Sequence, residues 1–125
     1  MNTLFRTPLF ITYIAVINLA SGITLSAHAD VVADWNNSAL DAIRAGNTSP
    51  PIASRSLAIL HVSIYDAVNG ITRSHEPYLV ESDVSTSASR PAAASAAAHQ
   101  VLVNLFPAHA STFDALHRSD SCHNP

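Results

Sequence analysis

Apolar residues in the first half of the chain recur at the spacing of an α-helix. Val32, Trp35, Ala39 and Ile43 follow one another at intervals of three or four residues, and a Gly-Asn pair comes directly afterwards. This spacing places the four side chains on one face of a helix. The pattern predicts a first helix over residues 31–45.

A second periodic segment is longer and carries apolar residues on two sides. It follows Pro50 and Pro51, and proline suits the first position of a helix. Its main apolar stripe consists of Leu57, Leu60, Ile64, Val68 and Ile71. Ile59 and Val62 lie on the other side. We therefore predict a helix over about residues 52–71, and apolar residues on both sides are typical of a helix inside a larger helical assembly.

A polar connection over residues 74–89 separates these helices from the rest, and within it residues 76–80 are expected to be briefly extended. The alanine-rich residues 92–106 have high helix propensity, and Pro107 directly follows them. A further short helix is predicted over residues 108–118.

Residues 119–125 are polar and without periodicity, so we expect an unstructured tail there. The predicted fold class is all-α, with three to four helices that form a partial helical bundle, the front portion of a larger all-α fold.

The first 29 residues have the layout of a secretory signal peptide. Arg6 precedes an apolar stretch over residues 9–20, and Ala27-His28-Ala29 forms a cleavage site of the Ala-x-Ala type. We expect cleavage before Asp30, a periplasmic or secreted protein, and no stable membrane anchor afterwards. The alternative is a retained anchor, since apolar character continues to Leu25.

Composition excludes several classes of protein. The chain is 48% hydrophobic and only 12% charged, which excludes a highly charged disordered tail. Its formal net charge is −3, and its six basic residues are scattered arginines, so we expect no nucleic-acid partner. The single cysteine, Cys122, excludes an intramolecular disulfide and is expected to be an incidental thiol.

Seven histidines suggest a metal site, but their spacing does not support one. No His-x-x-x-His pair occurs, and His109 and His117 are two helical turns apart, too far to share an ion. His61 is predicted to pair with Tyr65 one turn later. We assign no metal ligand and no cofactor-binding residue.

Ser54, Ser56, His61 and Asp66 are the residue types of a hydrolase triad. No Gly-x-Ser-x-Gly turn surrounds either serine, and residues five and ten positions apart on one rigid helix cannot converge. No catalytic residue is therefore assigned.

Three segments become informative when they are considered together. They are Trp35–Arg44 (WNNSALDAIR), Pro50–Ile71 (PPIASRSLAILHVSIYDAVNGI) and His99–Pro107 (HQVLVNLFP). They resemble the N-terminal region of secreted bacterial proteins related to the vanadium-dependent haloperoxidases, in the superfamily that includes type 2 phosphatidic acid phosphatases. The resemblance covers about residues 34–116 and implies that residues 30–118 form the helical N-terminal region of such a protein.

The resemblance is to supporting helices and does not include a reaction centre. In that family a Lys, two Arg, a Ser-Gly-His segment and a further His hold vanadate or phosphate, all in the later part of a longer chain. This sequence has no lysine and no Ser-Gly-His. Vanadate is thus a cofactor of full-length relatives and not one expected in this chain. The resemblance stops after Leu116, and we expect a truncated N-terminal fragment that is inactive alone.

Two alternatives remain open at this point. The chain could be a half-enzyme that a second chain completes with the anion site. It could instead be a small periplasmic helical module that binds a partner, or a second copy of itself, through the exposed apolar face of the helix over residues 52–71.

Overall fold

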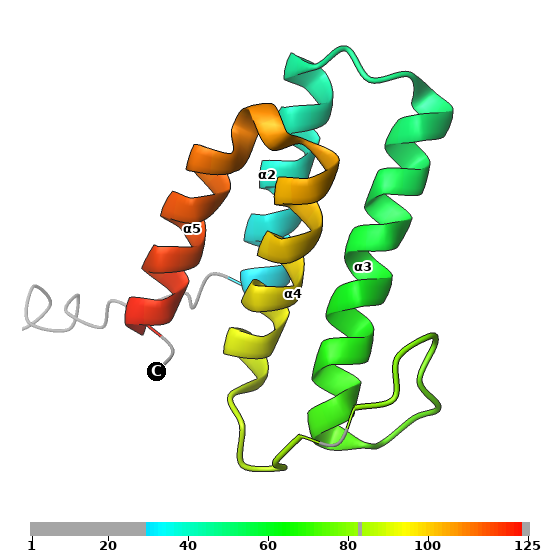
Figure 1. Ribbon diagram of the computed structural model, residues 1–125, viewed down its shortest axis with the longest axis vertical. Helices are drawn as coiled ribbons and strands as arrows, with labels where there is room; N and C mark the ends of the chain where they lie inside the picture. Colours follow the sequence, from blue (N-terminus) through cyan, green and yellow to red (C-terminus); the bar gives the residue numbers. More distant parts are fainter. Residues whose placement is uncertain (1–29, 83, 124–125) are drawn as a thin grey trace, which may run out of the picture.

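The protein is an all-α assembly, described here by a computed structural model for residues 30–82 and 84–123. Its helices are α2 (Val31–Ala45), α3 (Pro50–Thr72), α4 (Arg90–Leu105), the short 3-10 helix η1 (Pro107–His109) and α5 (Ala110–His123) (Figure 1). These residues contain no strand, and none of their helices is long and apolar enough to cross a membrane. The predicted signal peptide lies outside the described residues.

The helices predicted from periodicity are confirmed, with small shifts at their ends. Helix α2 has the predicted bounds, and α3 begins two residues earlier than predicted because both prolines fit its first turn. Polar side chains cap the N-termini of α2 and α4. Asp30 accepts a hydrogen bond from the Val32 N–H at 3.1 Å, and Ser89 accepts one from the Ala92 N–H at 3.4 Å.

Two predictions about segments outside the expected helices are wrong. Helix α5 continues to His123, so residues 119–123 are helical where we expected an unstructured tail. The physical reason is a tertiary contact, because Asp120 is hydrogen-bonded to side chains of α2 and α4. Residues 76–80 form no strand, and the chain bends at residues 78 and 79 instead of continuing extended.

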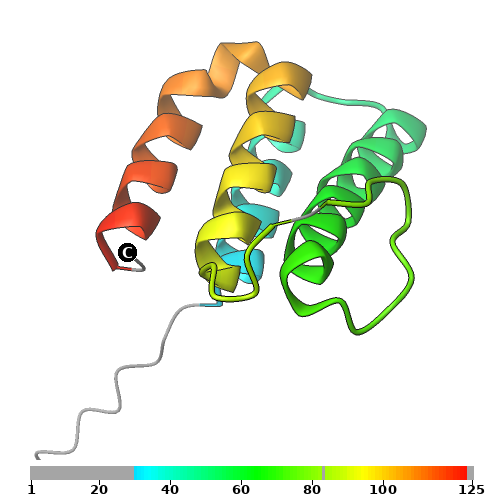
Figure 2. The same cartoon turned by 60° about the horizontal axis from the view of Figure 1, so that its bottom comes forward.

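Helix α4 lies in the middle of the bundle and contacts α2, α3 and α5 (Figures 1 and 2). Its contact surface is rich in small residues, including the buried Ala94 and Ala98, and Ala39 and Ala42 of α2 are buried as well. Small side chains allow helix axes to approach closely. The larger core side chains are Trp35, Leu60, Ile64, Leu102 and Phe113.

The connection between α3 and α4 is the longest irregular segment of the described ranges. Arg73 ends α3 in a left-handed conformation with φ 49°, which turns the chain away from the helix axis. The connection then loops out beside the C-terminal half of α3 before it reaches α4 (Figures 1 and 2). Polar side chains of α3 hold this segment in place.

Candidate functional site

The residues considered for a hydrolase triad do not converge. The buried Ser56 donates its hydroxyl hydrogen to the Ile52 carbonyl oxygen of its own helix at 2.9 Å, and Ser54 is exposed. His61 is exposed, and its Nε2 lies 3.0 Å from Oδ1 of Asn36 in α2. Ser56 and His61 therefore have different hydrogen-bond partners, one on α3 and one on α2.

The predicted pairing of His61 with Tyr65 is wrong, because each side chain has a different partner. His61 contacts Asn36, whereas the Tyr65 hydroxyl donates a hydrogen bond of 2.8 Å to the carbonyl oxygen of Glu76. Tyr65 thus belongs to a group of α3 side chains that hold the connection to α4.

Asp66 is the centre of this group. Its Oδ1 accepts a hydrogen bond from the Tyr78 N–H at 2.7 Å, and its Oδ2 accepts bonds from the N–H groups of Leu79 and Val80, both at 2.9 Å. The residue is only 6% exposed. Burial raises the pKa of the Asp66 carboxyl, but the hydrogen bonds from Tyr78, Val80 and Leu79 together outweigh burial and hold its pKa below the ordinary value of 3.8.

Asn69 adds a reciprocal pair of hydrogen bonds to the same segment. Its Nδ2 donates to the His75 carbonyl oxygen at 2.7 Å, and its Oδ1 accepts from the His75 N–H at 3.1 Å. We call Tyr65, Asp66 and Asn69 the loop clamp. These are the polar residues of the Tyr-Asp-Ala-Val-Asn motif, and all three bind main-chain groups between residues 75 and 80.

From the sequence, Asp66 was considered only as a member of a hydrolase triad, and the clamp was not predicted. The partners are main-chain groups, which every residue carries, so no pattern of side chains marks them. The one available signal was the clustering of Tyr, Asp and Asn at positions i, i+1 and i+4 just before a polar connection.

Two further contacts bring the connection close to α3. The Arg73 guanidinium donates to the Val84 carbonyl oxygen at 3.0 Å. Gly70 lies so close to Ser82 that a Cβ at position 70 would collide with the Ser82 hydroxyl in its present rotamer. A glycine here therefore permits the close approach of the segment.

The clamped segment presents apolar side chains to solvent. Tyr78, Leu79 and Val80 are 73%, 81% and 55% exposed, although their N–H groups are bound by Asp66. Beside them lies a pocket of about 410 Å³ between α3, the connection and the start of α4. Its lining is mostly apolar and consists of Val62, Ser63, Asp66, Ala67, Ile71, Leu79, Val80, Ser82, Val84, Ala88 and Ala93.

The second polar region joins α2, α4 and α5. Nε1 of the fully buried Trp35 lies 2.9 Å from Oδ2 of Asp120 and 3.2 Å from Oγ of Ser95, so its hydrogen is shared between them. Ser95 donates to the same Asp120 oxygen at 2.6 Å, and its Oγ lies 3.1 Å from Nδ1 of His117. We call Trp35, Ser95, His117 and Asp120 the Trp35 cluster.

These contacts do not have the order of a hydrolase triad. In a triad the serine hydroxyl donates to a histidine. Here Ser95 has one hydrogen, and when Asp120 is ionised that hydrogen goes to the carboxylate, so Nδ1 of His117 carries the hydrogen of the Ser95–His117 contact. Ser95 is also only 1% exposed. The cluster is suited to joining helices and not to nucleophilic attack.

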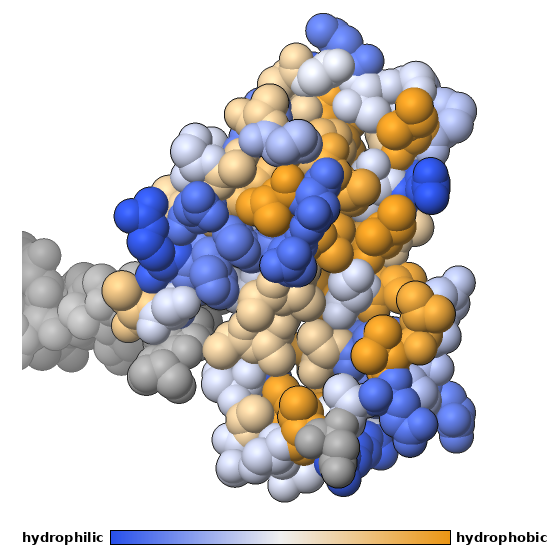
Figure 3. Space-filling view, in the orientation of Figure 1, coloured by the Kyte–Doolittle hydropathy of each residue, from blue (hydrophilic) through white to orange (hydrophobic). Residues whose placement is uncertain are grey.

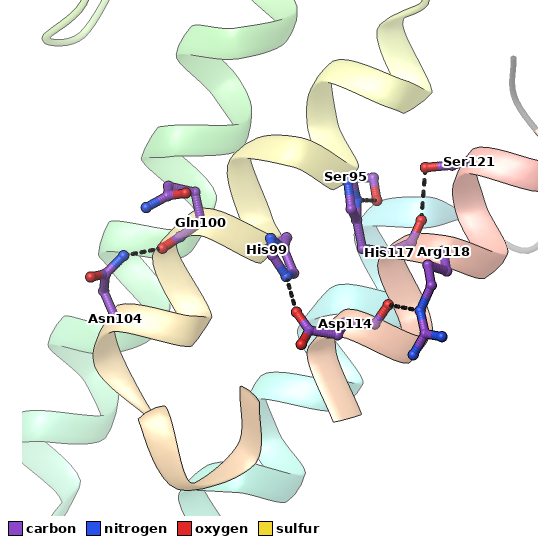
Figure 4. Close-up of polar contacts among 8 residues, drawn as sticks. All are labelled: Ser95, His99, Gln100, Asn104, Asp114, His117, Arg118 and Ser121. Carbon is purple, nitrogen blue, oxygen red and sulfur yellow. Dashed lines mark hydrogen bonds and ion pairs between the residues drawn. The ribbon is translucent and has the colours of Figure 1, made fainter. Parts of the chain in front are cut away.

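Two histidines that the sequence analysis treated as separate are neighbours. The rings of His99 on α4 and His117 on α5 stack with centroids 4.8 Å apart, and Nε2 of His99 lies 2.7 Å from Oδ1 of Asp114 (Figure 4). Over residues 30–82 and 84–123, however, no group of three or more His, Cys, Asp or Glu side chains is arranged to hold a metal ion. Cys122 is exposed on α5.

Comparison with known proteins gives no match: no family model, no curated protein and no solved structure is significantly similar to this chain.

Proposed function

We propose that this chain is the helical N-terminal scaffold region of a secreted protein of the haloperoxidase and acid-phosphatase type, inactive as an enzyme by itself. The observation that carries the proposal is the loop clamp. Tyr65, Asp66 and Asn69 belong to the segment Pro50–Ile71 that carries the resemblance, and their polar atoms bind the main chain of residues 75–80. Such contacts are structural, which supports a scaffold role for this motif.

The distribution of positive charge supports the same proposal. A vanadate or phosphate ion carries several negative charges and requires several fixed cations around it. The described cations lie on different elements: Arg44, Arg55, Arg73, Arg90 and Arg118. Arg44 pairs with Asp41 at 2.8 Å, and Arg118 donates to the Asp114 carbonyl oxygen at 3.1 Å. Partners within the chain for Arg44 and Arg118 support a region that holds no oxyanion by itself.

An activity assay tests the proposal directly. The purified protein is incubated with vanadate, halide and hydrogen peroxide, and separately with a phosphomonoester. We expect no turnover above the protein-free rate in either assay. Turnover that remains with the protein after repeated chromatography would contradict the scaffold role.

Secretion is part of the proposal and has its own test. The layout of residues 1–29 supports export followed by cleavage after Ala29. Mass spectrometry of the protein recovered from the periplasm or medium should give an N-terminus at Asp30. A product that retains residue 1 and sediments with membranes would instead support the retained anchor.

A second candidate function is a small helical interaction module or a half-enzyme completed by a second chain. The exposed side chains of Tyr78, Leu79 and Val80 favour it, because contiguous apolar surface on a soluble protein marks interaction sites. Size-exclusion chromatography over a range of protein concentrations separates the two candidates. A monomer at all concentrations supports a self-sufficient module, whereas concentration-dependent self-association supports a scaffold whose apolar surface requires further helices.

A further inference from the structure

We propose that the surface around Leu79 binds an amphipathic helix of a partner polypeptide. An apolar side chain of that helix enters the pocket beside Leu79, and a neighbouring Lys or Arg contacts Glu76 and Glu81. This inference goes beyond the scaffold role proposed above and develops the second candidate, an interaction module. It names the kind of partner that the clamped segment fits.

The apolar half of the surface is the pocket of about 410 Å³. Side chains of α3 and of the connection form its walls, with Val62 and Ile71 on one side and Leu79 and Val84 on the other. Among the described residues of the lining, Asp66 is the one that carries a charge, and three N–H groups bind its two oxygens. The pocket therefore favours an apolar group, and a large aliphatic or aromatic side chain has the suitable chemistry.

The acidic half is a second, more polar hollow of about 620 Å³ on the other side of the connection. Glu76 and Glu81 both line it, and both are exposed. Arg73 and His75 line it too, and the Arg73 guanidinium donates to the Val84 carbonyl oxygen. Among the described lining residues, two carboxylates therefore stand against one guanidinium. The excess of negative charge attracts a basic side chain, with a strength that falls as salt is added.

The two hollows are adjacent, because Val80 and Ser82 line both. Figure 3 shows hydrophobic side chains gathered on the side of the molecule over α3. A helix presents an apolar and a basic side chain on one face when they are three or four residues apart. One amphipathic helix can thus contact both hollows, whereas the two glutamates disfavour an anionic lipid surface.

The loop clamp gives this surface a fixed shape before binding. The contacts of Tyr65, Asp66 and Asn69 hold the main chain of residues 75–80 while the side chains of Tyr78 and Leu79 remain in solvent. A segment that is already ordered loses less conformational entropy on binding. The clamp therefore strengthens any interaction made through Leu79.

Fluorescence anisotropy with labelled synthetic peptides tests the proposal on the purified protein. The first peptide is a helix with Leu and Phe on one face and a Lys about four residues from the Leu. The second peptide is identical except that Glu replaces the Lys. We expect saturable binding of the Lys peptide that weakens with salt, and binding of the Glu peptide that is weaker by roughly tenfold.

Protein variants locate the binding surface. Leu79→Ser should weaken binding by roughly tenfold or more, as expected for a central apolar contact. Glu81→Gln should weaken binding less and should reduce its salt dependence. Ile52→Ser is the matched control, because Ile52 is also exposed, at 59%, but lies at the far end of α3. Unchanged thermal melting establishes that each variant is folded.

Three results would overturn the proposal. They are the absence of binding by the Lys peptide, equal binding of the Lys and Glu peptides, and unchanged binding by Leu79→Ser. Leu79-dependent sedimentation with phosphatidylcholine vesicles in the absence of peptide binding would assign the surface to lipid instead. Enzyme turnover would contradict the proposed scaffold role and leave these binding results unaffected, so the two failures are distinguishable.

Discussion

Two carboxylates organise the two polar regions of this protein in different ways. Asp66 binds main-chain N–H groups 12 to 14 residues later in the sequence. Asp120 binds side chains of Trp35 and Ser95, which are 85 and 25 residues away. The first carboxylate shapes one segment beside one helix, whereas the second joins three helices.

The difference determines which residues each region leaves available for other roles. Almost every residue supplies a main-chain N–H, so the loop clamp places few demands on the side chains at positions 78–80. Those side chains can therefore form a surface. The Trp35 cluster uses an indole N–H, a hydroxyl and an imidazole, so each of its residues is constrained by chemistry as well as by packing. One region presents side chains to solvent, and the other uses them to stabilise the fold.

Replacement of Trp35 should have the largest effect on stability, because this residue belongs both to the apolar core and to the Trp35 cluster. Trp35→Ala removes a fully buried indole and should lower the free energy of unfolding by about 3 to 5 kcal/mol. Urea denaturation followed by circular dichroism measures the loss. Trp35→Phe keeps a ring but lacks the N–H, so it should cost less. An unchanged midpoint for Trp35→Ala would show that this cluster does not join the helices.

Ser95→Ala should have the next largest effect. The substitution leaves an oxygen of the half-buried Asp120 and the His117 nitrogen without their hydroxyl partner, and it should destabilise the protein by about 1 to 3 kcal/mol. Ser87→Ala is the matched control, because Ser87 is exposed on the connection and its replacement should change stability by no more than about 0.5 kcal/mol. Equal denaturation midpoints for the two variants would remove the distinction between the regions.

Asp66→Asn should act locally. One carboxylate oxygen becomes an N–H₂ group that cannot accept a hydrogen bond, so the amides of Tyr78, Leu79 and Val80 should exchange with deuterium faster. The denaturation midpoint should change less than in Trp35→Ala. Hydrogen exchange measured by mass spectrometry or NMR gives the comparison. Unchanged exchange at all three amides would contradict the clamp.

The clamp also has a predicted pH dependence. Because the folded state lowers the pKa of Asp66 below 3.8, the ionised carboxylate stabilises the segment above that pH. The stabilisation is lost as pH falls through the lowered pKa. We expect protection of the three amides to persist at pH values above 3.8 and to decline below it, after correction for the intrinsic exchange rate. Loss of protection already at neutral pH would contradict the direction of this shift.

Gly70→Ala should change the free energy of unfolding least. Alanine gains up to about 1 kcal/mol of helix propensity over glycine, but its Cβ requires the Ser82 hydroxyl to rotate away. The two effects oppose each other, so we expect a net change of less than about 1 kcal/mol. In a Ser82→Ala background the obstacle is absent, and Gly70→Ala should be more stabilising. A large loss of stability in both backgrounds would show that the segment is held more rigidly than its contacts imply.

Hydrophobic periodicity was sufficient to locate the helices, because a buried helix face requires apolar residues every three or four positions. The residues of the predicted stripe of α3 include Leu60 and Ile64, which are buried, and the predicted bounds of α2 agree with the structure. Proline and glycine positions predicted where helices begin and end, since their effect on the backbone is local. The all-α class follows from these local signals.

The polar partners could not be predicted in the same way. Polar residues carry no periodic signal, and which of them meet depends on how the helices pack against one another. The sequence therefore left His99 and His117 as separate residues and the last turn of α5 as an irregular tail. It also left Asp66 without a partner, because the partners are main-chain groups of a nonperiodic segment.

By itself the sequence determined the helices, their apolar faces and the all-α class, because these depend on interactions between residues close in the chain. The tertiary structure alone decided that Asp120 meets Trp35 and Ser95, and that Asp66 holds Leu79 at the edge of an apolar pocket. Hydrogen bonds require their atoms to lie about 3 Å apart in a suitable orientation. Only the packing of helices and connections fixes such distances.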